Sequence, residues 1–122
     1  MRQVYLREIK RTEAAAPTYY TYDRPVDAGF VLVLTNLDVS WPDIATTEGG
    51  QFFIESGGQW VFLGGDVASI IGGGSCWHGK AAMGEHSRVG VYTPASAEDD
   101  VIRFSIVGEL WTKEAWRKGY QL

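Results

Sequence analysis

Residues 101–111 alternate apolar and polar side chains, and this pattern constrains the fold more than any other feature of the chain. Ile102, Phe104 and Ile106 fall on one face, whereas Arg103 falls on the other. A repeat of two residues predicts a β-strand with one side toward a core and the other toward solvent. The chain must therefore build at least one sheet that buries a single apolar face.

Similar strand patterns fill the middle of the chain, with turn residues about every 8–12 positions, which is typical of antiparallel sandwiches and barrels. Residues 28–41 begin with apolar residues on both alternating faces, which predicts a central strand covered on both sides. Residues 51–64 contain two short strand patterns around Gly57 and Gly58, which predicts a hairpin with a two-glycine turn. Strands do not alternate with helices, so a doubly wound α/β fold is not expected.

Residues 112–119 are the one notable segment with a helix pattern, with Thr112 as the expected N-cap and Gly119 as the end. Together these patterns predict an all-β fold, an antiparallel jelly-roll-like β-sandwich with an extended N-terminal arm and a short C-terminal tail. The expected organisation is an N-terminal arm or edge strand over 1–27, a β-sandwich domain over 28–112 and a C-terminal tail over 113–122.

The composition and charge of the chain argue against several classes of function. The 122 residues carry a net charge of −4, whereas a general nucleic-acid binder needs a basic surface to displace counterions. The first residues lack the apolar core of a secretion signal, and the longest apolar run, 30–34, is too short to cross a bilayer. The single cysteine, Cys76, excludes an intrachain disulfide and fits assembly in a reducing cytoplasm. We therefore expect neither a nucleic-acid nor a membrane partner.

The segment 70–81, IIGGGSCWHGKA, has almost the spacing of a phosphate-binding loop. Ala81 occupies the position where such a loop carries the hydroxyl that binds magnesium. Gly84 and Gly90 lie where the phosphate-cradling helix would have to begin, and no parallel sheet is expected to present the loop. We interpret the three glycines 72–74 as a hinge between strands instead.

Cys76, His78, Glu85 and His86 are candidate metal ligands within a short stretch. They do not have the spacing of the His-x-His and glutamate set of jelly-roll metalloenzymes, and a Cys76–His78 dyad would need a bulge to bring the two side chains together. We therefore expect no enzyme, no catalytic residue, no cofactor and no metal. A metal-dependent or cysteine enzyme built on Cys76, His78 and His86 remains an alternative. Gly79 lies inside a strand pattern, which indicates a bulge or a close approach of another chain or ring.

Five tryptophans are many for so small a core, so some of them are expected at an interface. Trp60 and Trp111, which lie in alternating strands, are expected in or near the core. Residues 11–27 form a long segment without a regular pattern, which either lies against a partner or covers an edge of its own sandwich. The expected partner-binding residues are Tyr19, Tyr20, Tyr22, Trp77 and Trp116.

The segments AGFVLVLTNLDVSW, WHGKAAMGEHSRVGVY and DDVIRFSIVGELW follow one another over roughly 28–111. In their order and in the placement of turns they resemble small jelly-roll structural proteins of tailed bacteriophages, namely capsid decoration (cement) or minor capsid proteins. The resemblance implies a non-enzymatic virion protein, assembled in the host cytoplasm. It also implies a homotrimer that binds the major capsid protein or another virion protein, with residues 1–27 and 113–122 gripping neighbouring subunits. The alternative is a carbohydrate- or receptor-binding β-sandwich module, for example at a tail or fibre tip, with a glycan as partner.

Overall fold

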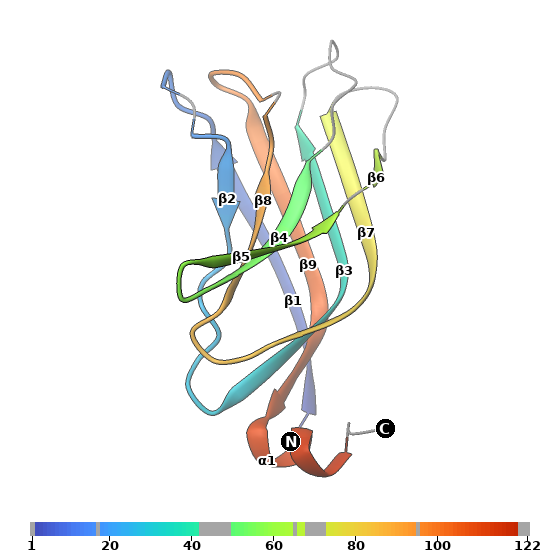
Figure 1. Cartoon of the computed structure of the whole chain (residues 1–122). Helices are drawn as coiled ribbons and strands as arrows, with labels where there is room; N and C mark the ends of the chain where they lie inside the picture. Colours follow the sequence, from blue (N-terminus) through green and yellow to red (C-terminus); the bar gives the residue numbers. More distant parts are fainter. Residues whose placement is uncertain are drawn as a thin grey trace.

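Two antiparallel β-sheets packed face to face make up the computed structural model of this chain, which confirms the predicted β-sandwich (Figure 1). The structure describes residues 2–16, 18–41, 50–64, 66–67, 73–94 and 96–119. The sequence also predicts a loop over residues 41–50, most of which lies outside these ranges, as does Gly72 of the expected hinge. Gly73 and Gly74 lie in a strand and pair with Trp41 and Ser40, so the expectation that they form a hinge is wrong. The elements are β1 (Arg2–Thr12), β2 (Tyr20–Tyr22), β3 (Phe30–Trp41), β4 (Gln51–Ser56), β5 (Gln59–Gly64), β6 (Asp66–Val67), β7 (Gly73–Met83), β8 (Arg88–Tyr92), β9 (Val101–Thr112) and α1 (Lys113–Gly119).

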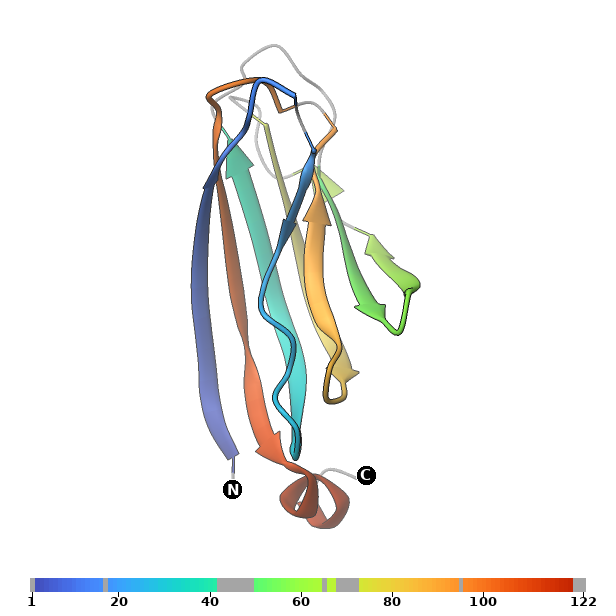
Figure 2. The same ribbon diagram turned by 90° about the vertical axis from the view of Figure 1, so that its left-hand side faces the viewer.

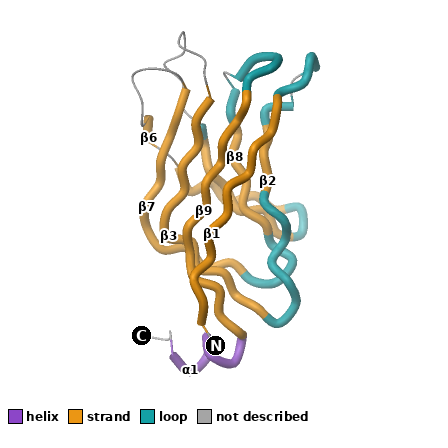
Figure 3. The backbone as a smooth tube through the Cα atoms, turned by 180° about the vertical axis from the view of Figure 1, so that it is seen from behind, coloured by secondary structure: helices purple, strands orange, loops and turns teal. Residues whose placement is uncertain are grey.

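The strands form nested antiparallel pairs. The innermost pair is the hairpin of β4 and β5, and around it β3 pairs with β7, β2 with β8 and β1 with β9. Further pairings of β3 with β9 and of β4 with β8 join these pairs into the sheets β1-β9-β3-β7-β6 and β2-β8-β4-β5. Figure 3 shows β1, β9, β3 and β7 side by side from behind. The hairpin turns at Gly57 and Gly58, both with positive φ, as the sequence predicts.

The N-terminal segment belongs to the sandwich. β1 pairs with β9 along its whole length, from Arg2 opposite Trp111 to Thr12 opposite Val101, and β2 pairs with β8 (Figure 2). Segment 1–27, expected as an arm or edge strand, therefore supplies one edge strand to each sheet. Of the two interpretations of residues 11–27, the geometry matches the one in which the segment covers an edge of its own sandwich.

The core lies between the two sheets. The inward side of β9 contributes Ile102, Phe104 and Ile106, which are buried as the alternation of 101–111 predicts. The rings of Phe52 and Phe104 face each other across the core, with centroids 6.0 Å apart. Burial of these large apolar side chains provides most of the free energy that opposes the entropy of the unfolded chain. The other buried members of this cluster are Val26, Leu32, Leu34, Leu37, Val39, Trp41, Met83, Val89 and Val91.

The central strand β3 changes which of its residues face the core at Thr35. Leu32 and Leu34 face inward before this position and Leu37 after it, because the register with both neighbouring strands shifts between residues 34 and 36. The hydroxyl of Thr35 donates to the carbonyl oxygen of Val107 at 3.1 Å. Such an irregularity lets one strand keep apolar residues inward on both sides of the shift.

The first half of β3 is buried on both faces, as predicted for a central strand. On the outer face, Val31 and Val33 form a second apolar cluster with Trp111. Ala115 and Trp116 of α1 pack against this cluster, and the rings of Trp111 and Trp116 lie edge to face at 6.3 Å. The C-terminal segment thus covers an apolar patch that would otherwise be exposed to solvent.

Helix α1 begins where the sequence predicts. The backbone N–H of Ala115 donates to the hydroxyl of Thr112 at 3.2 Å, which is the geometry of an N-cap. The helix runs for seven residues and ends at Gly119. Over the part of the chain that the structure describes, helices are too short and too polar to cross a membrane.

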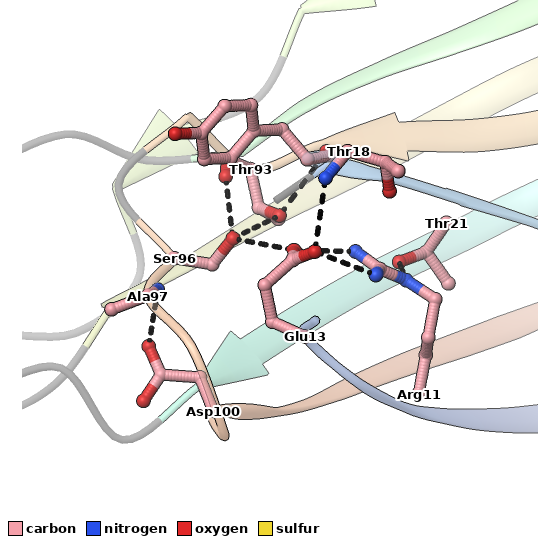
Figure 4. A network of polar contacts seen from close by, with 9 residues as sticks. Arg11, Glu13, Thr18, Thr21, Thr93, Ser96, Ala97 and Asp100 are labelled. Carbon is pink, nitrogen blue, oxygen red and sulfur yellow. Dashed lines mark hydrogen bonds and ion pairs between the residues drawn. The ribbon is translucent and has the colours of Figure 1, made fainter. Parts of the chain in front are cut away.

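Polar side chains close the space between the sheets at the β1/β2 edge. Asp23, which is buried, accepts hydrogen bonds from the Tyr5 hydroxyl at 2.5 Å and from Arg7 Nε at 3.1 Å. Burial and this contact with Asp23 raise the pKa of Tyr5 to about 12. A second network surrounds Glu13 and is centred on its ion pair with Arg11 (Figure 4). Charged hydrogen bonds therefore add to the apolar packing of Tyr5 and Ile9 at this edge.

Candidate binding surface

The outer side of the sheet β2-β8-β4-β5 carries aromatic side chains from all four of its strands. The strand registers bring them together, because Tyr20 lies opposite Tyr92, and Phe53 lies opposite Phe62. Residues opposite each other on neighbouring strands share one face of a sheet. We call this surface the aromatic face and define it as Tyr20, Tyr22, Phe53, Trp60, Phe62 and Tyr92.

The rings of the aromatic face pack at widely different angles, with edge-to-face, tilted and stacked pairs. Tyr20 lies at 84° to Trp60, with ring centroids 5.3 Å apart, and at 81° to Phe53. Phe53 and Trp60 are stacked instead, with planes that differ by 4° and centroids 4.6 Å apart, and Tyr20 and Tyr22 are stacked at 15°. Edge-to-face and stacked pairs are the arrangements that aromatic quadrupoles favour. The result is an uneven apolar cluster rather than a flat platform.

Gly90 makes this packing possible. It lies between Tyr22 on β2 and Phe53 on β4, in the middle of the sheet. A Cβ atom at this position would lie 2.7 Å from Phe53 Cζ and 2.8 Å from Tyr22 Cδ1. The missing side chain therefore leaves room for the two rings to close over the strand.

One ion pair borders the aromatic face. Arg88 bonds to Glu55 at 3.1 Å, and its guanidinium carbon lies 3.6 Å from the centroid of the Tyr22 ring. Burial raises the pKa of Tyr22, and the nearby Arg88 opposes that effect. The pair supplies both signs of charge beside an otherwise apolar surface and adds a cation–π contact.

Burial varies strongly across the aromatic face. Phe53 is fully buried although it lies on the outer side of the sheet, because neighbouring rings cover it. Trp60 is 39% exposed and Phe62 is 55% exposed. The expectation that Trp60 lies in or near the core is therefore wrong, because its strand is at the sheet edge and its face points away from the second sheet. Trp111, by contrast, is buried as expected.

The structure brings two of the five predicted partner-binding residues together in the aromatic face, namely Tyr20 and Tyr22. Tyr19 adjoins it with a positive φ of 67° and an edge-to-face contact to Tyr92 at 6.4 Å. Trp77 instead packs against the core from β7, and Trp116 packs against Trp111 at the other end of the molecule.

Four residues of the aromatic face were not predicted as partner-binding residues from the sequence, namely Phe53, Trp60, Phe62 and Tyr92. A signal for two of them was present, because a hairpin around Gly57 and Gly58 places Phe53 close to Phe62 across the strands. The hairpin pattern alone could not predict which of its faces points outward. Phe52 and Phe53 are adjacent, so only one of them can face the core, and the pattern does not say which.

Cys76 and His78 lie on the outer side of the other sheet, where they line a shallow depression with Asp38. His78 Nδ1 lies 3.1 Å from the side-chain oxygen of Asn36, and burial raises the pKa of Asp38. His86 lies in the turn after β7, so that most of the strand separates it from Cys76. Within the described ranges, His, Cys, Asp and Glu side chains do not gather in threes suited to a metal ion.

The ring expected near Gly79 belongs to the same strand. A Cβ atom at Gly79 would lie 2.8 Å from Trp77 Cζ2, so the indole ring lies across the glycine. Trp77 thus folds along β7 toward its own sandwich, with its side chain half-buried against the core. The register of β3 with β7 also shifts beside Gly79, between the pairs Leu34–Ala81 and Asn36–His78, as the predicted bulge requires. The irregularity and the indole contact together account for the glycine without a neighbouring chain.

Comparison of the chain with protein-family models, with curated proteins and with solved structures finds no match. Any functional argument therefore rests on the residues of this chain. Among the residues that the structure describes, the aromatic face combines the largest group of clustered rings with exposed apolar side chains, which makes it the candidate binding surface.

Proposed function

We propose that the chain is a non-enzymatic structural protein of a tailed-phage virion that binds another virion protein through the aromatic face. The observation that carries the proposal is the exposure of Trp60 and Phe62 beside the fully buried ring of Phe53. Contiguous exposed apolar surface of this kind marks contact sites on folded proteins, and aromatic residues dominate the energetics of such sites. The major capsid protein is the first candidate partner.

The strand order supports this proposal. Nested antiparallel pairs folded over into two facing sheets are the pattern of an eight-stranded jelly roll, and here the two-residue strand β6 is the only addition within the described residues. Jelly rolls occur in viral capsid domains and also in lectins. The strand order is therefore compatible with a capsid protein and with a glycan-binding protein. The choice between these two classes has to rest on the residues of the surface.

The aromatic face replaces the N-terminal arm as the proposed contact. Residues 2–12 are hydrogen-bonded along β9, so they are engaged within their own chain. The exposed side chains of β1, Val4 and Leu6, lie on the outer side of the other sheet and form a separate, aliphatic patch. We assign the main contact to the surface with the larger rings, because each buried aromatic side chain contributes more apolar area.

Binding to phage heads tests the proposal. Purified heads assembled without this chain are mixed with the wild-type chain, with F62S and with V4S, and bound protein is measured by co-sedimentation. We expect wild type and V4S to bind and F62S to bind at least tenfold more weakly, because the serine removes the most exposed ring of the aromatic face. Equal binding of F62S and wild type, or no binding of wild type, contradicts the proposal.

A glycan-binding module is the second candidate, favoured by the Arg88–Glu55 ion pair beside the rings. Sugars stack on aromatic rings that lie flat and exposed, and polar side chains at the rim bind their hydroxyl groups. In the aromatic face, however, the rings of Tyr20 and Trp60 are nearly perpendicular, and Phe53 already covers one face of Trp60. A glycan array with the wild-type chain and F62S distinguishes the two candidates.

A further inference from the structure

Strand β5 is an edge strand that lacks two of the usual protections against pairing with another strand, namely charge and proline. It ends the order β2-β8-β4-β5, and its six residues include no charged residue and no proline. Natural edge strands are commonly blunted by lysine, proline or short length, because an open row of N–H and C=O groups recruits another strand. At the other described edges, β1 carries several charged residues, β2 has three residues and β6 has two.

Three consecutive side chains of β5, at 60–62, are exposed to solvent, and they lie on both faces of the sheet. Trp60 and Phe62 lie on the aromatic face, and Val61, opposite Ile54, points to the other side of the sheet and is 59% exposed. The β4–β5 hairpin stands at the side of the molecule away from β1 (Figure 2). A strand added at this edge would therefore cover apolar side chains above and below the sheet while it satisfies backbone hydrogen bonds.

We propose that β5 pairs with β5 of a second copy of this chain, antiparallel and across a two-fold axis at Val61. The two four-stranded sheets then form one continuous sheet of eight strands. This inference rests on the proposed function in one respect, since it makes part of the aromatic face a protein contact surface. The partner at that edge is a second copy of this chain.

The register follows from self-complementarity. If Val61 lies opposite its own copy, Trp60 of each chain lies opposite Phe62 of the other, and both aromatic pairs fall on the same side of the sheet. Phe53 neighbours Phe62 in each chain, so rings continue across the junction from one aromatic face to the other. Cross-strand aromatic pairs are among the more stabilising pairs in antiparallel sheets.

The regular part of β5 is long enough for this pairing. The register of β4 with β5 shifts only between Phe52 and Phe53, which places the irregularity at Leu63. Residues 59–62 keep a regular register with β4, so the centre of the proposed pairing is undistorted. Neither charge nor proline within β5 opposes the approach of an identical strand.

A charge placed on the two-fold axis tests the pairing. In V61K the new side chain meets its own copy, so we expect the dimer of the wild-type chain to dissociate at least tenfold more readily, as measured by size-exclusion chromatography with light scattering. V61E is expected to do the same. A mixture of tagged V61K with untagged V61E is expected to restore the dimer, because opposite charges then face each other, and pull-down on the tag detects it.

V4K is the matched control, because Val4 is 71% exposed on the edge strand β1, and this variant is expected to keep the wild-type mass. Thermal unfolding shows that each variant is folded. A wild-type chain that is monomeric at its highest soluble concentration, a trimer whose mass V61K leaves unchanged, or a failure of V61K and V61E to associate overturns the pairing. A monomer that still binds phage heads overturns only the pairing, and a V61K-sensitive dimer that fails to bind heads overturns only the proposed function.

Discussion

Glu13 shows how a single side chain can fasten two loops together. It is buried, and its carboxylate accepts two hydrogen bonds from Arg11, at 3.0 and 2.8 Å. Ser96 Oγ, in the loop between β8 and β9, donates to it at 3.0 Å, and the N–H of Thr18 does so at 3.1 Å (Figure 4). The hydrogen bonds from Arg11 are the main cause that lowers the pKa of Glu13 to about 2, against the opposing effect of burial.

The stability of the fold is expected to depend on the charge of Glu13. Because the folded chain holds the carboxylate with a pKa below its ordinary 4.5, its stabilisation is complete above about pH 5 and falls as the pH drops toward 2. The difference corresponds to roughly 3 kcal/mol at neutral pH. Urea denaturation from pH 7 to pH 3 should show this loss in the wild-type chain.

E13Q is expected to be less stable than wild type by roughly 2–3 kcal/mol at pH 7 and to depend much less on pH between 5 and 3. E114Q is the control, because Glu114 is exposed and its ion pair with Lys118 contributes little. An E13Q chain with the pH dependence of the wild type would show that other carboxylates govern the acid transition.

The irregularity in β3 requires glycine on the neighbouring strand. Gly108 of β9 lies opposite Leu34, directly before the register shift, and a Cβ atom there would lie 2.4 Å from the carbonyl oxygen of Val33. Since that contact is with backbone rather than with a flexible side chain, the central strands would have to separate. The close approach therefore positions β3 so that its apolar residues stay inward on both sides of Thr35.

We expect G108A to reduce the free energy of unfolding by about 1–3 kcal/mol, as overpacking in a rigid interior does. G84A provides the comparison, because a Cβ atom at Gly84 meets no atom within 4 Å, and its effect should stay within about 0.5 kcal/mol. Denaturant titrations of the two variants measure the difference. Similar stabilities of G108A and G84A would mean that β3 and β9 separate at little cost.

Across the whole molecule, the nested pairing places the first and last strands side by side. β1 pairs with β9 over 11 residues, and Tyr5 and Ile9 pack against the core from this edge. The N-terminal strand therefore belongs to the outermost of the nested pairs and covers one edge of the sandwich. Its loss would expose the backbone of a central strand, β9, together with one side of the core.

Deletion of residues 1–22 is expected to abolish cooperative folding, because it removes one edge strand from each sheet and such domains are stable by only about 5–15 kcal/mol. The interpretation of this segment as a gripping arm predicts the opposite result, a folded sandwich that fails to attach. Circular dichroism with thermal unfolding decides between them. A chain with V4S and L6S, two exposed positions of β1, should unfold as the wild type does.

Local features of the structure could be predicted from the sequence. The alternation of 101–111, the hairpin at Gly57 and Gly58 and the N-cap at Thr112 depend on neighbouring residues, and the structure confirms each of them. The candidate binding surface was readable only in part, because Tyr20 and Tyr22 are close in sequence, whereas Phe53 and Trp60 join them through strand pairing.

Trp60 and Trp111 separate what the sequence by itself determined from what the tertiary structure decided. The sequence correctly predicts that both lie in strands, and it predicts both in or near the core. Alternation cannot say which face another layer covers. Helix α1 packs over Trp111 and buries it, whereas Trp60 sits on an edge strand whose outer face stays open to solvent. The alternation of residue types along the chain thus determined where strands form. Long-range strand pairing and packing decided which aromatic rings remain available for binding.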